Sequence, residues 1–269
     1  MKLPPRVVRR HRSPWQVHRS VLFALFMREL RTRLGGRWLG MLWLVGEPLA
    51  HVLLMLAIFT YVRNVSARHT DFPLFLVTGL LPFFMFRNLS LRLADAIASN
   101  RGLFSYRQVK PIDTLVARAS VETVLHSAVY AAALLLLAWW GLPALPHAPL
   151  ELMLASINLV MLGLGIGLVL AVACHGRPRL RAAVGLVFLP LYLASGVIFS
   201  IESTPPDVRA WLMLNPVAHL IDLSRTFFIA GHFRMAETSM AYSAAWALAA
   251  TALGLSLYRV DRHRLITRD

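Results

Sequence analysis

The sequence predicts an all-α, polytopic membrane protein with six transmembrane helices, and three observations support this prediction. Of the 269 residues, 57% are hydrophobic and only 15% are charged, whereas a soluble domain has about 25% charged residues. Six apolar stretches each approach the ~20 residues that a helix needs to cross the hydrocarbon core. If these stretches cross in turn, 23 of the 28 Lys and Arg residues fall in segments on one side.

The elements follow from hydropathy and from turn residues. Before the first span, apolar residues of 17–33 recur near a helical period among arginines, which predicts an amphipathic interface helix that Gly35-Gly36 ends. Between the fifth and sixth spans, Pro205-Pro206 can open a helix and Asn215-Pro216 should break one. We expect a broken, re-entrant helical pair there, covering 206–214 and 217–230. The six spans are expected at 39–62, 72–91, 119–140, 150–174, 181–200 and 240–258.

The pattern predicts one membrane domain with basic ends. Residues 1–38 form a basic N-terminal part with the interface helix, 39–258 the membrane domain, and 259–269 a basic tail. Loops rich in Lys and Arg stay in the cytoplasm, so both termini are expected there. The net charge is +15. Because the cations lie beside apolar spans, we expect them to contact anionic lipid rather than nucleic acid.

Several kinds of chemistry are missing from the sequence. A phosphate loop needs Gly-x-x-x-x-Gly-Lys-Ser/Thr, and the only lysines are Lys2 and Lys110, the latter followed by Pro111. We therefore expect no ATP site and no cofactor in this chain, and no enzyme activity of its own. Cys174 is the only cysteine, so no intramolecular disulfide forms, and Cys174-His175 alone makes a poor metal site.

Polar residues inside expected spans are candidates for function. Glu47 and His51, and again Glu122 and His126, are four apart and so share a helix face. Three interpretations stay open for them. The two side chains of each pair bond to each other or to a neighbouring helix, they line a polar path for a hydrophilic substrate, or they form a proton relay. Gly163 and Gly167 have a spacing that favours close helix packing over a ligand role.

Several motifs together resemble a known family. They are residues 28–33 with 39–43 and 47–49, then 100–103 with 109–111, and finally 214–216 with His219, Asp222 and 225–228. Their order and spacing are similar to the permease subunit of ABC-2 type exporters, and most similar to the capsular polysaccharide exporters. The Arg-rich segment from Arg6 to Arg19 extends beyond the family's core motif.

The resemblance implies a homodimer in the bacterial inner membrane, bound to two copies of a separate ATPase subunit that holds ATP and Mg²⁺. It also implies a lipid-linked acidic polysaccharide as cargo, with a periplasmic co-polymerase and outer-membrane export proteins as further partners. The implied contacts with the ATPase are Arg28, Glu29, Arg31, Arg33, Asn100, Arg101, Lys110 and Pro111. The candidates for the substrate path or gate are Glu47, His51, Glu122, Trp211, Asn215, Pro216, Asp222, Arg225, Phe227 and Phe228.

Other functions stay open at this point. A sister ABC-2 permease would transport O-antigen, teichoic acid or a small lipophilic molecule. A proton-coupled secondary transporter is less favoured because no inverted repeat is visible. A membrane-embedded enzyme acting on lipid-linked sugars would need clustered acidic residues, and Glu47 and Glu122 are isolated in the sequence. The aromatic residues Trp211, Phe227 and Phe228 either stack on sugars or belong to an interfacial belt.

Overall fold

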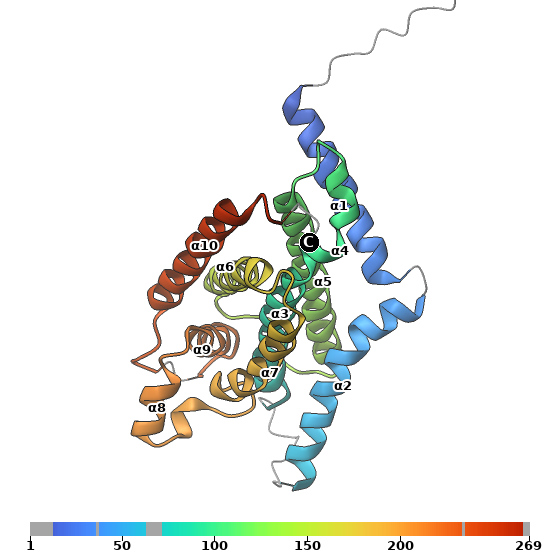
Figure 1. Cartoon of the computed structure of the whole chain (residues 1–269). Helices are drawn as coiled ribbons and strands as arrows, with labels where there is room; N and C mark the ends of the chain where they lie inside the picture. Colours follow the sequence, from blue (N-terminus) through green and yellow to red (C-terminus); the bar gives the residue numbers. More distant parts are fainter. Residues whose placement is uncertain (1–12, 36–37, 63–71, 233–234, 266–269) are drawn as a thin grey trace, which may run out of the picture.

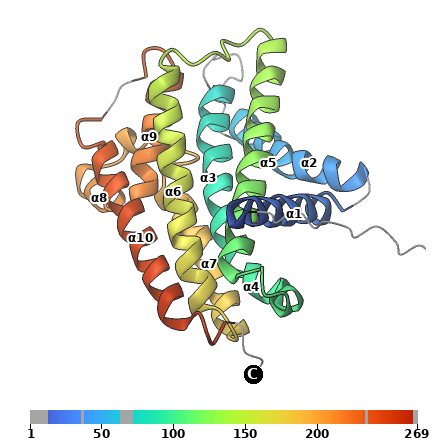
Figure 2. The same ribbon diagram turned by 90° about the horizontal axis from the view of Figure 1, so that it is seen from above.

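The structure, a computed structural model, describes residues 13–35, 38–62, 72–232 and 235–265, and every regular element within these ranges is helical. Four helices are long and apolar enough to cross a membrane: α3 (Phe72–Ala94), α5 (Pro111–Trp139), α6 (Pro149–Ala173) and α10 (Met240–Asp261). They run side by side (Figure 2). The all-α membrane class expected from the sequence is confirmed.

The other two expected spans differ from these four. α7 (Pro178–Ala194) has 17 residues and is therefore about 25 Å long, short of the ~30 Å hydrocarbon core. It ends at Ala194 rather than at residue 200, because Gly196 turns the chain with φ 64°. α2 (Trp38–Val62) contains the apolar stretch Gly46–Phe59 and crosses α3 and α5 steeply (Figure 2). A total of six spans stays a prediction.

Glycines bring α6 close to both of its neighbours. A Cβ atom at Gly167 would lie 2.9 Å from Cβ of Leu93 on α3, and one at Gly163 would lie 3.1 Å from a Leu89 methyl. On the other side of α6, a Cβ at Gly165 would lie 2.6 Å from the backbone nitrogen of Thr251 on α10. The packing role expected for Gly163 and Gly167 is confirmed.

α5 begins at Pro111, eight residues before the expected start of the third span. Pro111 occupies the first helical position, where a missing N–H costs nothing. The backbone N–H of Lys110 donates to the Asp113 carboxylate over 2.9 Å and fixes this helix start. Asp113 and Arg118 lower the hydropathy of the first turns, so the apolar pattern begins only at residue 119.

α1 (Pro14–Leu34) begins three residues before the expected interface helix. Ser13 caps it and exchanges hydrogen bonds with Gln16 in a capping box. It ends at Gly35, whose φ is 67°, in agreement with the expected stop. α1 lies across the bundle near the end that also holds the short helix α4 (Ala96–Ser99) and the 3₁₀-helix η1 (Arg101–Ser105) (Figures 1 and 2).

The helical pair between α7 and α10 exists as expected. α8 (Pro206–Leu212) and α9 (Pro216–Phe228) are separated by the Asn215-Pro216 break. They follow the 3₁₀-helix η2 (Ile201–Ser203). α9 lies against the start of α6, where the Ala148 N–H donates to the Phe227 carbonyl over 3.1 Å. How deep the pair sits in a membrane stays a prediction.

The bundle has a basic end and an opposite end. The basic end holds α1, α4, η1, the start of α5 and the last turns of α10, where the Tyr258 hydroxyl accepts from the Ile112 N–H over 3.3 Å. The opposite end holds the connection from α5 to α6 and the last turns of α9, and α8 lies beside α9 nearer the middle of the bundle (Figure 2).

Candidate functional site

Polar contacts attach α1 to the basic end. The Arg28 guanidinium donates to the Asn100 side chain over 2.8 Å. Glu29 pairs with Arg118 of α5, which also donates to the Arg92 carbonyl over 3.2 Å. The side of α1 that faces α5 therefore includes charged residues, so the apolar face expected from the sequence is not purely apolar.

Glu122 is the deepest charge of this region and is only 2% exposed. Its Oε1 atom lies 3.1 Å from Arg33 Nε of α1 and 3.2 Å from Arg92 Nε of α3. Its Oε2 atom lies 3.7 Å from Nε2 of His126, one turn along α5. A charge at this depth needs paired partners, and long-range contacts with two other helices supply them.

The polar chain continues from His126 towards α2. His126 Nε2 lies 3.2 Å from the Asn88 amide, and Asn88 in turn accepts from Arg87 over 3.2 Å. Arg87 is 3.7 Å from Glu47, whose side chain is 58% exposed. Side chains of α1, α3, α5 and α2 thus form one polar network.

His51 takes a separate place. Its Nε2 atom is 3.4 Å from the Tyr192 hydroxyl of α7, and its ring meets Phe84 edge-on with centroids 5.1 Å apart. Both Glu47 and His51 therefore contact a neighbouring helix, which is one of the interpretations left open. A substrate contact for either residue stays a prediction.

The connection from α4 to α5 presents cations to the surface. Arg101, Arg107 and Lys110 are exposed, whereas Asn100 is buried and accepts from Arg28. Arg31 of α1 is exposed as well. Of the expected coupling residues, Arg31, Arg101 and Lys110 are thus available to a partner, while Asn100 and Pro111 shape the surface from beneath.

Towards the opposite end, Asn215 and Pro216 start α9. The Asn215 side chain accepts from the Val217 N–H over 3.0 Å and donates to the Ser195 hydroxyl over 2.8 Å. Pro216 takes the first helical position. This pair therefore ties the start of α9 to the end of α7.

Arg225 is buried against the turn that follows α7. Its guanidinium donates to the Gly196 carbonyl over 2.8 Å and to the Val197 carbonyl over 2.6 Å, and it lies 3.5 Å from the centre of the Phe75 ring. Only 2% of Arg225 is exposed. The residue satisfies backbone carbonyls that would otherwise lack donors.

Asp222 and His219 hold the chain that leads into α10. The Thr238 hydroxyl donates to Asp222 over 2.7 Å. His219 Nδ1 accepts from the Ser239 N–H over 3.1 Å while its Nε2 lies 2.8 Å from the Met213 carbonyl. Because an N–H only donates and a carbonyl only accepts, His219 is neutral with its proton on Nε2.

The three candidate aromatic residues differ in exposure. Trp211 is 76% exposed, whereas Phe228 is 1% exposed and belongs to the hydrophobic core. Phe227 is partly buried. Trp211 is the one of these three that presents most of its ring to a ligand or to lipid.

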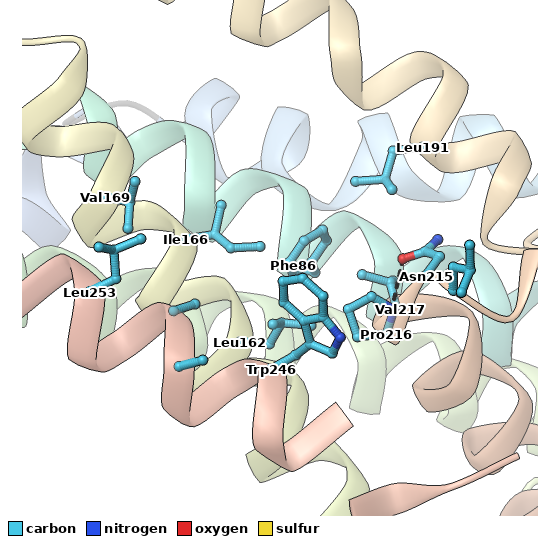
Figure 3. A pocket seen from close by; sticks show the side chains of 13 residues that line it. Phe86, Leu162, Ile166, Val169, Leu191, Asn215, Pro216, Val217, Trp246 and Leu253 are labelled. Atoms are coloured by element: carbon cyan, nitrogen blue, oxygen red, sulfur yellow. Dashed lines mark hydrogen bonds between the residues drawn. The ribbon is translucent and has the colours of Figure 1, made fainter. Parts of the chain in front are cut away.

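An apolar groove of about 420 Å³ adjoins the Asn215-Pro216 break. Phe86 of α3 and Trp246 of α10 lie in its middle, with Asn215 and Pro216 at one end and Val169 and Leu253 at the other (Figure 3). Trp246 is 49% exposed and Leu253 is 54% exposed. The groove therefore opens on the outer face of α10.

Among the described residues, no group of three His, Cys, Asp or Glu side chains could hold a metal ion. The features of the chain that could contact a ligand or a partner are its exposed cations, its polar network and its apolar groove. A helical bundle with apolar spans and a charged end is the architecture of a polytopic helical membrane protein.

Comparison with known proteins identifies the family. Residues 20–229 match the model of the ABC-2 type transporter family, so the chain belongs to this family. It is 38% identical to the polysialic acid transport protein KpsM of Escherichia coli, over 95% of this chain and 99% of that protein. It is 30% identical to the capsule polysaccharide export inner-membrane protein CtrC of Neisseria meningitidis, over 81% and 80%. The O-antigen export system permease RfbA of Myxococcus xanthus is 27% identical, over 84% and 87%.

Proposed function

We propose that this chain is the permease subunit of an ATP-driven exporter that moves a lipid-linked capsular polysaccharide across a bacterial inner membrane. The observation that supports this most is the 38% identity to a polysialic acid transport protein over nearly the full length of both chains. The named cargo of that relative is an acid, and a chain with a net charge of +15 suits an anionic polymer.

Each end of the bundle has a separate role in this function. Two ATPase subunits bind the basic end of a permease homodimer, on the cytoplasmic side, and supply the ATP and Mg²⁺ that this chain has no phosphate loop to bind. Arg31, Arg101 and Lys110 face them. The α8–α9 pair lies on the exit side, where periplasmic co-polymerase and outer-membrane proteins take over the polymer.

Reconstitution tests the proposal. The permease is expressed together with a candidate ATPase subunit, and the complex is purified and placed in liposomes with the lipid-linked polymer. We expect co-purification, ATP-dependent movement of polymer, and no ATP hydrolysis by the permease alone. Hydrolysis by the permease alone, or polymer movement without the ATPase, would contradict the proposal.

O-antigen export is the second candidate, because RfbA is a relative. Complementation of two strains distinguishes the two functions. One strain lacks its capsule permease and the other lacks its O-antigen permease. Each strain receives this chain together with the ATPase subunit that co-purifies with this chain. We expect surface polymer to return in the capsule strain. Restoration of the O-antigen strain alone would assign the second cargo.

A further inference from the structure

One buried carboxylate binds the guanidinium groups of two different helices. Glu122 of α5 is 2% exposed, and the same oxygen atom faces Arg33 of α1 and Arg92 of α3. Removal of its charge would leave two cations facing each other in a region of low dielectric. The relative position of α1 and α3 therefore depends in part on this group.

α1 has few other anchors at this site. Leu25 is its one fully buried residue among those described, and its polar contacts are those of His18, Arg28, Glu29 and Arg33. α3, in contrast, is buried along most of its length. Ion pairs in a region of low dielectric attract strongly, so α1 follows α5 and α3 while these pairs hold and is released when they break.

Glu122 also connects two polar branches. One leads outward to α1 through Arg33, and the other leads through His126, Asn88 and Arg87 towards α2. The remaining charged residues of α1 that make described contacts bind nearer the basic end, to Asn100 and Arg118. Glu122 is thus the buried point at which a displacement of α1 reaches both α5 and α3, beside the more exposed contact of Glu29 with Arg118.

We propose that Glu122 is a positioning residue that transmits the movement of α1 to α3 and α5, and not a residue that contacts the polymer. The inference rests on the proposed function, in which the ATPase acts on the basic end. α1 and the spanning helices then move as one body while Arg33 and Arg92 share the Glu122 carboxylate.

The first test is the Glu122→Gln variant in the reconstituted complex with its ATPase. Glutamine keeps the size of the side chain and removes its charge. We expect the complex to assemble with a lower thermal midpoint, because a buried ion pair is broken, and to hydrolyse ATP at the wild-type rate, with polymer export per ATP lower by about tenfold. Glu151→Gln on α6 is the matched control, because Glu151 is exposed, and its export should stay at the wild-type level.

A double-mutant cycle checks that Arg33 and Glu122 act together. Arg33→Gln should uncouple export as Glu122→Gln does, and the double variant should lose no more than either single one, because contacting residues are not additive. Arg33 is 21% exposed, and substitution of a partly exposed residue perturbs folding less than that of a buried one. The Arg33→Gln variant therefore still tests the inference if Glu122→Gln does not assemble. Equal loss of export and ATP hydrolysis, or full additivity, would overturn the inference.

A distance measurement tests the same inference without any polymer. Spin labels are placed at Ser20 of α1 and Ser120 of α5, both exposed, in a Cys174→Ala background. With Glu122 present we expect one narrow distance distribution, and in the Glu122→Gln variant a broad one. An unchanged distribution would refute the positioning role. If the wild-type complex moves no polysaccharide, the proposed function fails, while this measurement still decides on Glu122.

Discussion

At the scale of single residues, Gly165 sets how closely α6 approaches α10. A Cβ atom there would meet the backbone nitrogen of Thr251 at 2.6 Å, and backbone cannot rotate away as a side chain can. We expect Gly165→Ala to destabilise the protein by about 1–3 kcal/mol, the usual cost of overpacking. The thermal unfolding midpoint in detergent should fall by several degrees.

The matched control for this prediction is Gly185→Ala on α7. A Cβ atom at Gly185 would have no neighbour closer than 4.0 Å, and alanine favours a helix by about 1 kcal/mol over glycine. Its midpoint should stay constant or rise. If both variants unfolded at the same temperature, α6 and α10 would not be packed as closely as the structure has them.

Glu47 and Glu122 illustrate what the sequence could predict about the site. Both precede a histidine by four residues, and the sequence treats them alike. In the structure Glu47 is 58% exposed, and Glu122 is 2% exposed between two arginines. An exposed pair contributes at most about 1 kcal/mol, whereas breaking a buried one costs about 3–5 kcal/mol. The partners, Arg33 and Arg92, are distant in the sequence, so only the fold reveals which pair is buried.

At the scale of elements, the α8–α9 pair depends on the N-cap of α9. Asn215 caps α9 and also binds Ser195 at the end of α7. Serine caps a helix about as well as asparagine but is too short to reach Ser195. We expect Asn215→Ala to lower stability by about 0.5–2 kcal/mol for the lost cap, and Asn215→Ser by less.

The measurement is the thermal midpoint of the two variants beside the wild type. The expected order is wild type, then Asn215→Ser, then Asn215→Ala. Equal loss in both variants would mean that the bond to Ser195, and not the cap, holds this part of α9. No loss in either would mean that α9 is fixed by its apolar contacts alone.

The sequence placed most elements but missed some boundaries, for physical reasons. The break at Asn215-Pro216 and the stop at Gly35 were predicted because they depend on local backbone chemistry. The start of α5 at Pro111 was missed because Asp113 and Arg118 interrupt the apolar pattern before residue 119, and the charge of Arg118 is paired with Glu29 of α1. The end of α7 was missed because apolar residues continue past the turn at Gly196.

At the scale of the whole molecule, the cation distribution predicts which end faces the cytoplasm. Ser105 closes η1 at the basic end, and Ser203 closes η2 just before α8. Both are exposed, and each hydroxyl donates to a carbonyl three residues earlier. Ser105→Cys and Ser203→Cys are therefore a matched pair, each made in a Cys174→Ala background.

Spheroplasts treated with a membrane-impermeant maleimide decide the orientation. Because 23 of 28 cations lie on one side of the predicted topology and such segments stay in the cytoplasm, Ser203→Cys should be labelled at once. Ser105→Cys should be labelled only after permeabilisation. The reverse pattern would invert the molecule and place the α8–α9 pair on the ATPase side. Labelling of both in intact spheroplasts would mean that the connection through η1 does not stay inside, and the basic end could not then bind an ATPase.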